Sequence, residues 1–419
     1  MDWQAVFEAV EAKRELIVKT LCDVIHIDTS VPPGHNYDKM ADYLEPIFQR
    51  LGFETERVVV PPEKLAQIPL PLEGERVNLV ARKRFGKEPC SIYAHMDVVP
   101  VEEPWTIDPF AGVVKEGKVY GRGAIDMKGS IASLIGALAV IEELSLTPHY
   151  DLICLMCTDE EIGTYPGVYH LALEGYVEGH VLCLEGGAQA PFLVGGMAGD
   201  VTVTVTTIGK SCHSGMNFLG VNAIDEMVPI LNELLALKRR VEQRKSSVPL
   251  FPIPGAPSEW MSPMFNLVII QGGVKDNIIP SRCTVTIDRR YIPEEDYEDV
   301  VAEIREAVER GRRQSKALDV QVAVQWIYGA FKADPESPHM HRMWEAKKAV
   351  HGYRDEDLLV AGVAGSSDMG MVVPLLGDGK FAGTGPFRPD NTTAHRPDEF
   401  ACVDDLVSMA KELIYYLAG

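Results

Sequence analysis

Strand-like and helical segments alternate along the first 184 residues of this chain. Short apolar, β-branched runs are typical of buried strands, and apolar residues repeated every three or four positions are typical of helices. Such alternation favours a parallel or mixed sheet that is covered by helices on both faces. We therefore predict an α/β domain. Its predicted strands span residues 56–60, 76–82, 90–95, 151–157 and 180–184, and its predicted helices span 1–21, 40–53, 127–144 and 166–175.

The pattern changes near residue 199, where "DVTVTVTTIG" alternates with a period of two, as a half-exposed strand does. The order that follows is strand, helix, strand, strand, helix, strand, the split βαβ pattern of a ferredoxin-like α+β domain. The predicted strands here span 200–209, 265–271, 282–291 and 319–327, and the predicted helices 221–244 and 294–315.

After residue 330 the α/β character resumes, with a helix over 337–352, a strand-like run "LLVAGVAG", a Gly-rich loop region over 376–395 and a last helix over 402–418. A chain of 419 residues is long enough for two domains. We predict one discontinuous domain, 1–198 and 331–419, with a mixed, mostly parallel sheet, interrupted by an α+β insertion over 199–330.

Bulk properties exclude some classes of function. A formal charge of −21 disfavours nucleic-acid binding, which needs clustered basic residues. The N-terminus has no apolar core of the signal-peptide type, and the longest nearly apolar stretch, "SIASLIGALAVI", is too short to span a membrane and predicts a buried helix. Eight scattered cysteines suit a reducing cytoplasm, and we interpret Cys154 and Cys157 as small core residues of a strand. We therefore expect a cytoplasmic protein.

Acidic and imidazole groups gather in the loops of the predicted α/β domain, near strand ends, where open α/β sheets place their ligands. These groups are His95 and Asp97, Asp126, Glu160 and Glu161, Glu185, and His395. Two imidazoles and several carboxylates form a nitrogen and oxygen ligand set that suits zinc, or cobalt or manganese in its place. Five protein ligands exceed what one tetrahedral zinc ion uses, and a bridging carboxylate, for which Asp126 is the natural candidate, points to two ions.

Spacing suggests roles for the neighbouring residues. Asp97, two residues after His95, can accept a hydrogen bond from the ring nitrogen that does not bind metal. In "DEE", one glutamate can bind a metal ion while the other takes a proton from an activated water molecule and passes it to a leaving group.

Five ordered motifs, "HMD", "GRGAIDMKG", "TDEEIG", "LEGG" and "AHRPDE", resemble those of the M20 co-catalytic zinc hydrolases over nearly the whole chain. That family comprises aminoacylases, desuccinylases, deacetylases, carnosine dipeptidases and carboxypeptidases. The resemblance implies two zinc ions per subunit, bridged by Asp126, with His95 and Glu185 on one ion, Glu161 and His395 on the other, and Glu160 as the general base. It also implies a cis peptide between Asp126 and Met127. Asp398 departs from the asparagine that many members carry at that position.

The insertion resembles the lid or dimerisation domain of the same family. "IGKSCHSG" matches a family pattern, so that His213 would polarise the scissile carbonyl, commonly in the neighbouring subunit's active site. By the same resemblance Asn277, Arg290 and Asp368 are candidate substrate contacts, and the protein would form a homodimer through the insertion. Arg290 has an alternative as a partner of Asp288, and Asn277 as a turn residue.

We predict a metal-dependent amide hydrolase that cleaves N-acyl amino acids, with a dipeptidase or carboxypeptidase as the alternative. A non-catalytic metal-binding or assembly protein of the same fold is an alternative of another class, and the intact Glu160 argues against it. Taken singly, each site residue has an ordinary structural explanation, so the prediction depends on their joint order. His339 and His341, outside this set, are expected to be exposed at a helix start.

Overall fold

The computed structural model of the chain describes residues 1–163, 166–377, 379–388, 391 and 393–419. Its contacts divide the chain into two compact units. The first unit comprises Met1–Gly195, Ala333–Ala361 and Met371–Gly419, and the second unit comprises Gly196–Lys332 and Gly362–Gly370. The segment Gly362–Gly370, which the sequence prediction gave to the discontinuous domain, clusters with the second unit. The Gly365 carbonyl accepts a bond from the Ala198 amide there (3.2 Å). The roles of the units as catalytic domain and lid stay predictions.

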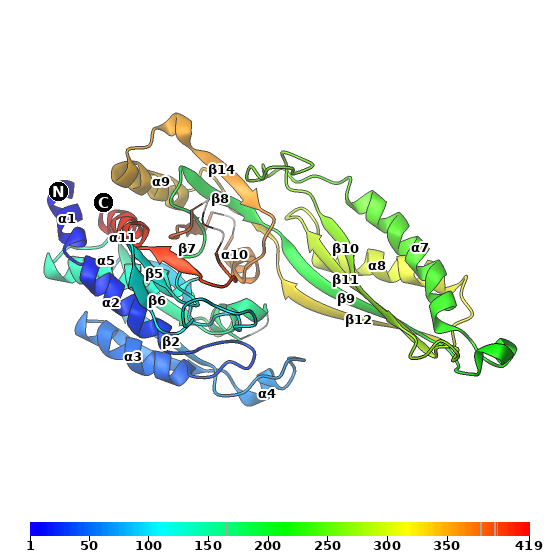
Figure 1. Cartoon of the computed structure of the whole chain (residues 1–419). Helices are drawn as coiled ribbons and strands as arrows, with labels where there is room; N and C mark the ends of the chain where they lie inside the picture. The colour runs from blue at the N-terminus through cyan, green and yellow to red at the C-terminus, as the bar shows by residue number, and fades with distance from the viewer. Residues whose placement is uncertain (164–165, 378, 389–390, 392) are drawn as a thin grey trace. The chain divides into compact units, whose positions relative to one another are not determined.

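The first unit is built on a six-stranded sheet of order β1-β2-β6-β3-β7-β15. Figure 1 labels β2, β6 and β7 of this sheet. Its strands are β1 (Glu54–Val59), β2 (Val77–Lys83), β3 (Glu88–His95), β6 (Tyr150–Cys157), β7 (His180–Cys183) and β15 (Phe381–Gly383). The pairs β1–β2 and β2–β6 are antiparallel, and β6–β3, β3–β7 and β7–β15 are parallel. This mixed, mostly parallel sheet confirms the predicted α/β class. β15 lies in the region that we interpreted as a Gly-rich loop, because a strand of three residues leaves no periodic pattern in the sequence.

Several helices pack on this sheet. The helices that lie wholly or mostly in the first unit are α1 (Trp3–Glu11), α2 (Arg14–Ile25), α3 (Tyr37–Arg50), α4 (Pro62–Leu65), α5 (Lys128–Glu143), α6 (Val168–Leu173), α9 (Pro338–His351), α10 (Met369–Leu376) and α11 (Val403–Ala418). Of these, α3 contacts β1 and β2, α5 contacts β3, and α9 contacts β15. The predicted N-terminal helix is thus two helices, with a break at Ala12 and Lys13. α5 contacts α2, α11 and β3, so the apolar stretch that it contains is a buried helix, as predicted.

Two three-stranded sheets complete the strand inventory, and the sequence prediction missed most of their strands. One has the order β16-β5-β4 and is antiparallel, with β4 (Val113–Lys115), β5 (Lys118–Tyr120) and β16 (Phe400–Cys402). The other has the order β13-β8-β14, with β8 (Phe192–Met197), β13 (Phe331–Lys332) and β14 (Leu359–Val363). The first of these sheets matters for the site, because β5 and β16 join remote parts of the chain.

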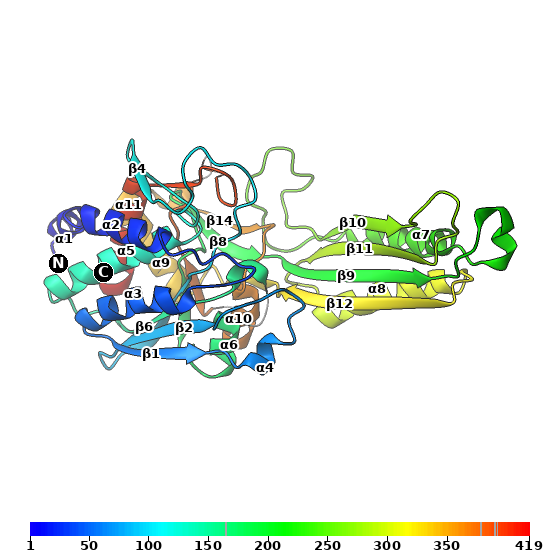
Figure 2. The same ribbon diagram turned by 60° about the horizontal axis from the view of Figure 1, so that its bottom comes forward.

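The second unit holds an antiparallel sheet of order β10-β11-β9-β12, and Figure 2 shows its strands side by side with two helices behind them. The elements are β9 (Gly199–Ile208), α7 (Ala223–Val241), β10 (Met264–Gly272), β11 (Arg282–Tyr291), α8 (Tyr297–Arg312) and β12 (Asp319–Tyr328). Alternate residues of β9, such as Val201, Val203 and Val205, are buried with Ile230 and Leu234 of α7. This order and the helices on one face confirm the ferredoxin-like prediction.

All eight cysteines are free thiols, and Cys154 and Cys157 are buried in β6 as predicted. Within the described residues, no helix combines the length and the apolar character that a membrane crossing requires. The cellular compartment stays a prediction.

Candidate metal centre

Candidate site residues from three segments of the chain lie at one edge of the six-stranded sheet. β3, β6 and β7 are parallel neighbours, so their carboxyl ends meet there. His95 is the last residue of β3, Glu160 and Glu161 form the 3-10 helix η1 (Glu160–Ile162) after β6, and Glu185 follows β7. The topology therefore delivers these four side chains to a common place from segments far apart in the chain.

Asp126 and His395 reach the same place from the small antiparallel sheet. β5 and β16 pair in register, with Tyr120 opposite Phe400. Asp126 lies in the loop after β5, just before α5, and His395 lies in the loop before β16. The peptide between Asp126 and Met127 is cis, as the family resemblance implied.

Five predicted ligands form two groups that share one residue. His95, Asp126 and Glu185 make the first group, and Asp126, Glu161 and His395 make the second. In each group the candidate ligand atoms lie within 4.8 Å of one another. This is the arrangement that a bridging carboxylate between two ions requires.

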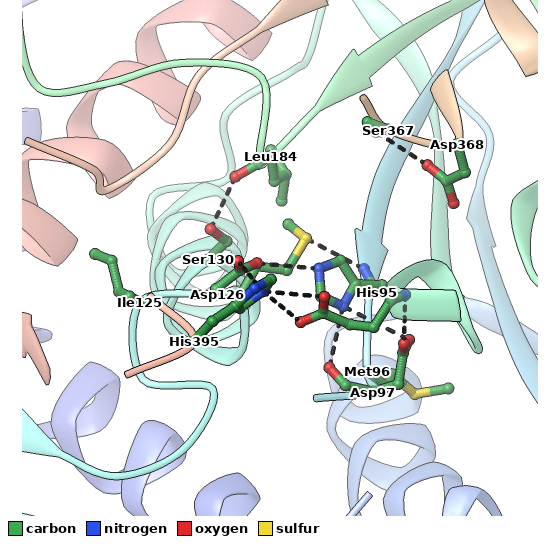
Figure 3. Close-up of polar contacts among 12 residues, drawn as sticks. His95, Met96, Asp97, Ile125, Asp126, Ser130, Leu184, Ser367, Asp368 and His395 are labelled. Atoms are coloured by element: carbon green, nitrogen blue, oxygen red, sulfur yellow. Dashed lines mark hydrogen bonds and ion pairs between the residues drawn. The ribbon is translucent and has the colours of Figure 1, made fainter. Parts of the chain in front are cut away.

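The carboxylate of Asp126 lies between two imidazoles, as Figure 3 shows. Its Oδ1 atom is 3.3 Å from Nε2 of His95, and its Oδ2 atom is 3.3 Å from Nε2 of His395. The same nitrogen of His395 lies 3.0 Å from Glu161 Oε2. His95 is fully buried, whereas the side chain of His395 is half-exposed, so the second group is the more open to solvent.

Asp97 supports this cluster in two ways. The Nδ1 atom of His95 lies 3.1 Å from the Asp97 carbonyl oxygen and 3.6 Å from its carboxylate, so the backbone, rather than the predicted carboxylate, is the nearer acceptor. The Asp97 carboxylate instead accepts the backbone N–H of Glu161 through Oδ2 (2.9 Å). Asp97 therefore connects a residue of the first group to a residue of the second.

Buried side chains that contact Asp159 stabilise the turn that carries Glu160, and the sequence prediction missed these contacts. Asp159 has a positive φ of 59° and is buried, and its carboxylate accepts the hydroxyl proton of Tyr37 (3.1 Å). Arg76, also buried, places Nε 3.4 Å from the other carboxylate oxygen. Glu160 itself is 5 % exposed. No periodicity or motif marks Arg76 in the sequence; only the fold brings it under the "DEE" turn.

The electrostatics favour positive charge at this cluster. Hydrogen bonds to Asp126 and Glu161 raise the pKa of His395 to about 10. Burial raises the pKa of Glu161, and the Asp126 charge raises it further. Burial also acts to raise the pKa of Asp126, but the two imidazoles outweigh it and the pKa falls below the usual range. Carboxylates crowded in this way stabilise protons or cations between them.

The donor set fits a pair of divalent ions. Two imidazoles and three carboxylates, with one carboxylate common to both groups, are ligands suited to zinc, cobalt or manganese. The side chains would exchange the protons that they now share for the ions, since metal ligation requires neutral imidazole and ionised carboxylate.

The four predicted substrate residues belong to the second unit. His213 is exposed, and its Nδ1 atom accepts the Gly215 N–H (3.0 Å), which leaves the ring proton on Nε2. Asn277 lies beside it: its carbonyl accepts the Ser214 N–H (3.0 Å), and its side chain is exposed. These two predicted residues thus come together within the second unit.

Arg290 carries partners that reduce its capacity to bind a substrate carboxylate. Its guanidinium lies 3.1 Å from Asp288 and 3.2 Å from the buried Asp200, and it donates to Ser366 (3.1 Å). Two carboxylates therefore already balance its charge. Arg290 also lines a cavity of about 390 Å³ together with Trp260 and other residues of the second unit. Asp368 is buried before α10, where Ser367 contacts its carboxylate (3.3 Å).

The structure corrects one expectation about a histidine outside the cluster. His339, which we expected to be exposed, is buried and stacks on His180 with ring centroids 3.6 Å apart. His341 is exposed, as predicted. The two histidines lie on opposite sides of the first turn of α9, and their sequence spacing does not show which side faces the core.

Known proteins resemble this chain in sequence and in fold. The family model "Peptidase family M20/M25/M40" matches residues 91–418. A probable succinyl-diaminopimelate desuccinylase of Staphylococcus epidermidis is 24 % identical over 409 residues, which cover 93 % of this chain and 94 % of the relative.

Two solved structures share the fold at 18 % sequence identity. The M20 family metallo-carboxypeptidase Sso-CP2 from Sulfolobus solfataricus gives a TM-score of 0.78 and covers 96 % of this chain and 98 % of its own. Human carnosine dipeptidase 1 gives a TM-score of 0.75, and the match covers 99 % of this chain and 98 % of the dipeptidase chain. The family match extends over most of the chain and includes all five candidate ligands. The chain therefore belongs to the M20/M25/M40 peptidase family, metallohydrolases that act on carbon–nitrogen bonds.

Proposed function

We propose that this protein is a dinuclear-metal amide hydrolase that removes the acyl group from N-acyl amino acids. The observation that carries the proposal is the shared position of Asp126 in two ligand groups, next to the buried Glu160 turn. The native ions would be two zinc ions per subunit, with cobalt or manganese as substitutes. The name of the Staphylococcus epidermidis relative supports an acyl group as the part removed.

Each candidate residue would have a distinct task in this reaction. The bound ions would acidify a water molecule and polarise the scissile carbonyl. Glu160 would take the proton of that water and later give it to the departing nitrogen, so that one carboxyl group acts first as base and then as acid. His213 would donate a hydrogen bond from its Nε2–H to the carbonyl oxygen as negative charge develops there. Asp97 would hold His95 and Glu161 in position through the contacts described above.

The proposed substrate residues have different roles. Asn277 is exposed beside His213 and is available to donate to a substrate carboxylate or carbonyl. Arg290 and Asp368 would shape the pocket, since Arg290 is already paired with Asp200 and Asp288.

A dipeptidase or carboxypeptidase activity is the second candidate. It would use the same residues, and it is favoured by the two solved structures of similar fold, whose names denote a carboxypeptidase and a carnosine dipeptidase. A panel of N-succinyl and N-acetyl amino acids, dipeptides and C-terminally free peptides, assayed with added zinc, cobalt or manganese, separates the candidates. A kcat/KM at least about tenfold higher for acyl amino acids, roughly 1.4 kcal/mol of transition-state binding, supports the first. The reverse order supports the second, and no metal-dependent turnover on any amide contradicts both.

We also propose a homodimer through the second unit. β10 is an edge strand of its sheet, and large apolar side chains are exposed on and near it. Val268 (54 %) and Ile270 (61 %) lie on β10, and Val274 (88 %) follows it in the sequence. An edge strand flanked by exposed apolar residues is typical of a protein interface. Light scattering coupled to size exclusion tests this: a mass of one chain at micromolar concentration contradicts the dimer, and Ile270→Lys should shift a dimer toward monomer.

A further inference from the structure

Glu399 lies next to the β16-β5-β4 sheet, where the loop that carries Asp126 begins and the loop that carries His395 ends. It directly precedes β16, which pairs with β5. The Gly121 N–H, directly after β5, donates to the Glu399 carbonyl (2.9 Å) and continues the ladder by one bond. The backbone of Glu399 thus ties the start of the Asp126 loop to the end of the His395 loop.

Its side chain reaches further into the Asp126 loop. Glu399 is fully buried, and its Oε1 atom accepts the backbone N–H groups of Ile125 (3.0 Å) and Asp126 (3.3 Å). Its Oε2 atom accepts a bond from Arg122 Nη1 (2.7 Å). Both oxygens of one carboxylate therefore hold the short segment that ends at Asp126, including that residue's own amide.

Arg122 completes the connection. Its side chain is 4 % exposed, it lies 5.0 Å above the Trp105 ring, and Nη1 also approaches the Arg396 carbonyl (3.5 Å). Arg396 is next to His395. A buried carboxylate needs a partner of opposite charge, and this guanidinium supplies it while it spans the same two loops.

From these contacts we infer that Glu399, with Arg122, is a positioning residue of the metal centre. It fixes the bridging carboxylate of Asp126 relative to His395 and so sets the geometry of the second group (Asp126, Glu161 and His395). The first group depends on it less, because two of its three ligands, His95 and Glu185, lie at or just after the ends of main-sheet strands, whereas in the second group only Glu161 does. This inference rests on the proposed pair of ions.

The test compares metal binding by Glu399→Gln with that of the natural protein. Each protein is stripped, titrated with Zn²⁺ or Co²⁺ by calorimetry, and its ion content is measured after dialysis. The Co²⁺ absorption spectrum reports the ligand geometry separately from activity. Since partners of metal ligands typically contribute 10–100-fold to affinity, Glu399→Gln should bind one ion almost normally and the other about 10–100-fold more weakly. Its Co²⁺ spectrum at two equivalents should differ from that of the natural protein.

Glu295→Gln is the matched control. Glu295 also forms an ion pair with a buried arginine, Arg289 (2.6 Å), and accepts a backbone N–H, that of Ile292 (3.0 Å), within the second unit. Its loss should lower thermal stability without changing either affinity. If Glu399→Gln is insoluble, Arg122→Lys takes its place, and it should weaken the same ion to a smaller degree.

The outcomes separate the inference from the proposed function. A natural protein that binds fewer than two ions contradicts the dinuclear centre itself. Two ions in the natural protein with unchanged affinities in Glu399→Gln and Arg122→Lys, or equal weakening of both ions, overturns the positioning role. Selective weakening of one ion, absent in Glu295→Gln, supports it.

Discussion

Asp126 and His395 lie in segments of the first unit that are far apart in the sequence, yet Oδ2 of Asp126 lies 3.3 Å from Nε2 of His395. The in-register pairing of β5 with β16 brings their loops together. Because Asp126 also contacts His95, its carboxylate is the element common to both ligand groups. Loss of this one side chain should therefore affect both ions.

We predict that Asp126→Ala retains no tightly bound ion after dialysis, whereas His395→Ala retains one. Asp126→Ala removes a ligand from both groups, whereas His395→Ala removes a ligand from the second group only. Elemental analysis of dialysed protein measures this. His341→Ala, which changes an exposed histidine outside the groups, should keep two ions. Equal ion content in the Asp126 and His395 variants would contradict the shared position of Asp126.

Glu160→Gln should lower kcat by about 10²–10⁴-fold, because the amide cannot accept the proton of the attacking water. Glu160 belongs to neither ligand group, so the ion content should stay at two per chain. Steady-state kinetics and elemental analysis on the same sample check both statements. Retention of more than a tenth of the activity would exclude Glu160 as the general base.

Chelation should lower the melting temperature of the natural protein, and zinc should restore it. An ion that binds only the folded state stabilises it by about 2.7 kcal/mol when present at a hundred times its Kd. Removal of the ions also leaves the carboxylates of Asp126 and Glu161 close together. Differential scanning calorimetry with and without chelator measures the shift. Asp126→Ala serves as the control, since a protein that binds no ion should not respond to chelator.

His339 should contribute a loss of stability as the pH falls below neutrality. Burial and the nearby Lys380 charge lower its pKa from 6.5 to about 4. Between these values the unfolded chain takes up a proton that the folded chain does not, so the free energy of unfolding falls as the pH falls from about 6.5 to about 4. At pH 5 the loss should be on the order of 1–2 kcal/mol.

Urea denaturation of metal-free protein at pH 7 and pH 5 measures this loss when the natural protein is compared with His339→Leu, because the other titrating groups are common to both. Between pH 7 and pH 5 the free energy of unfolding of His339→Leu should fall less, or rise more, than that of the natural protein. His341→Leu, at the exposed position, should behave like the natural protein. An unchanged difference in His339→Leu would assign the effect to other groups.

Arg76→Met should reduce the free energy of unfolding by about 3 kcal/mol or more, because it leaves the Asp159 carboxylate buried without its cation. Arg76 also donates to the carbonyls of Pro33 (2.7 Å) and Gly74 (3.0 Å), which would lose that partner. Arg57→Met, which removes a partly exposed ion pair with Glu45, should cost less than about 1 kcal/mol. If both variants lose a similar free energy of unfolding, the buried ion pair stabilises the protein no more than the partly exposed one.

Much of the fold could be read from local patterns. The strands of the main sheet and of the second unit have clear apolar periodicities, and the helix and strand order gave both architectures correctly. Most of the missed elements are short. β15 and the strands of the β16-β5-β4 sheet have three residues each, too few for a period. The burial of His339 depends on which side of α9 faces Tyr150 and His180, and no local rule decides that.

The sequence by itself determined the chemistry of the candidate centre: two imidazoles and several carboxylates, placed where parallel strands end and where their side chains meet. Only the tertiary structure decided how they are held. It made the Asp97 carbonyl the nearer partner of His95, placed Arg76 under the Glu160 turn, and set Glu399 against the Asp126 amide. These contacts join segments far apart in the chain, and strand pairing and burial, rather than local residue pattern, bring such segments together.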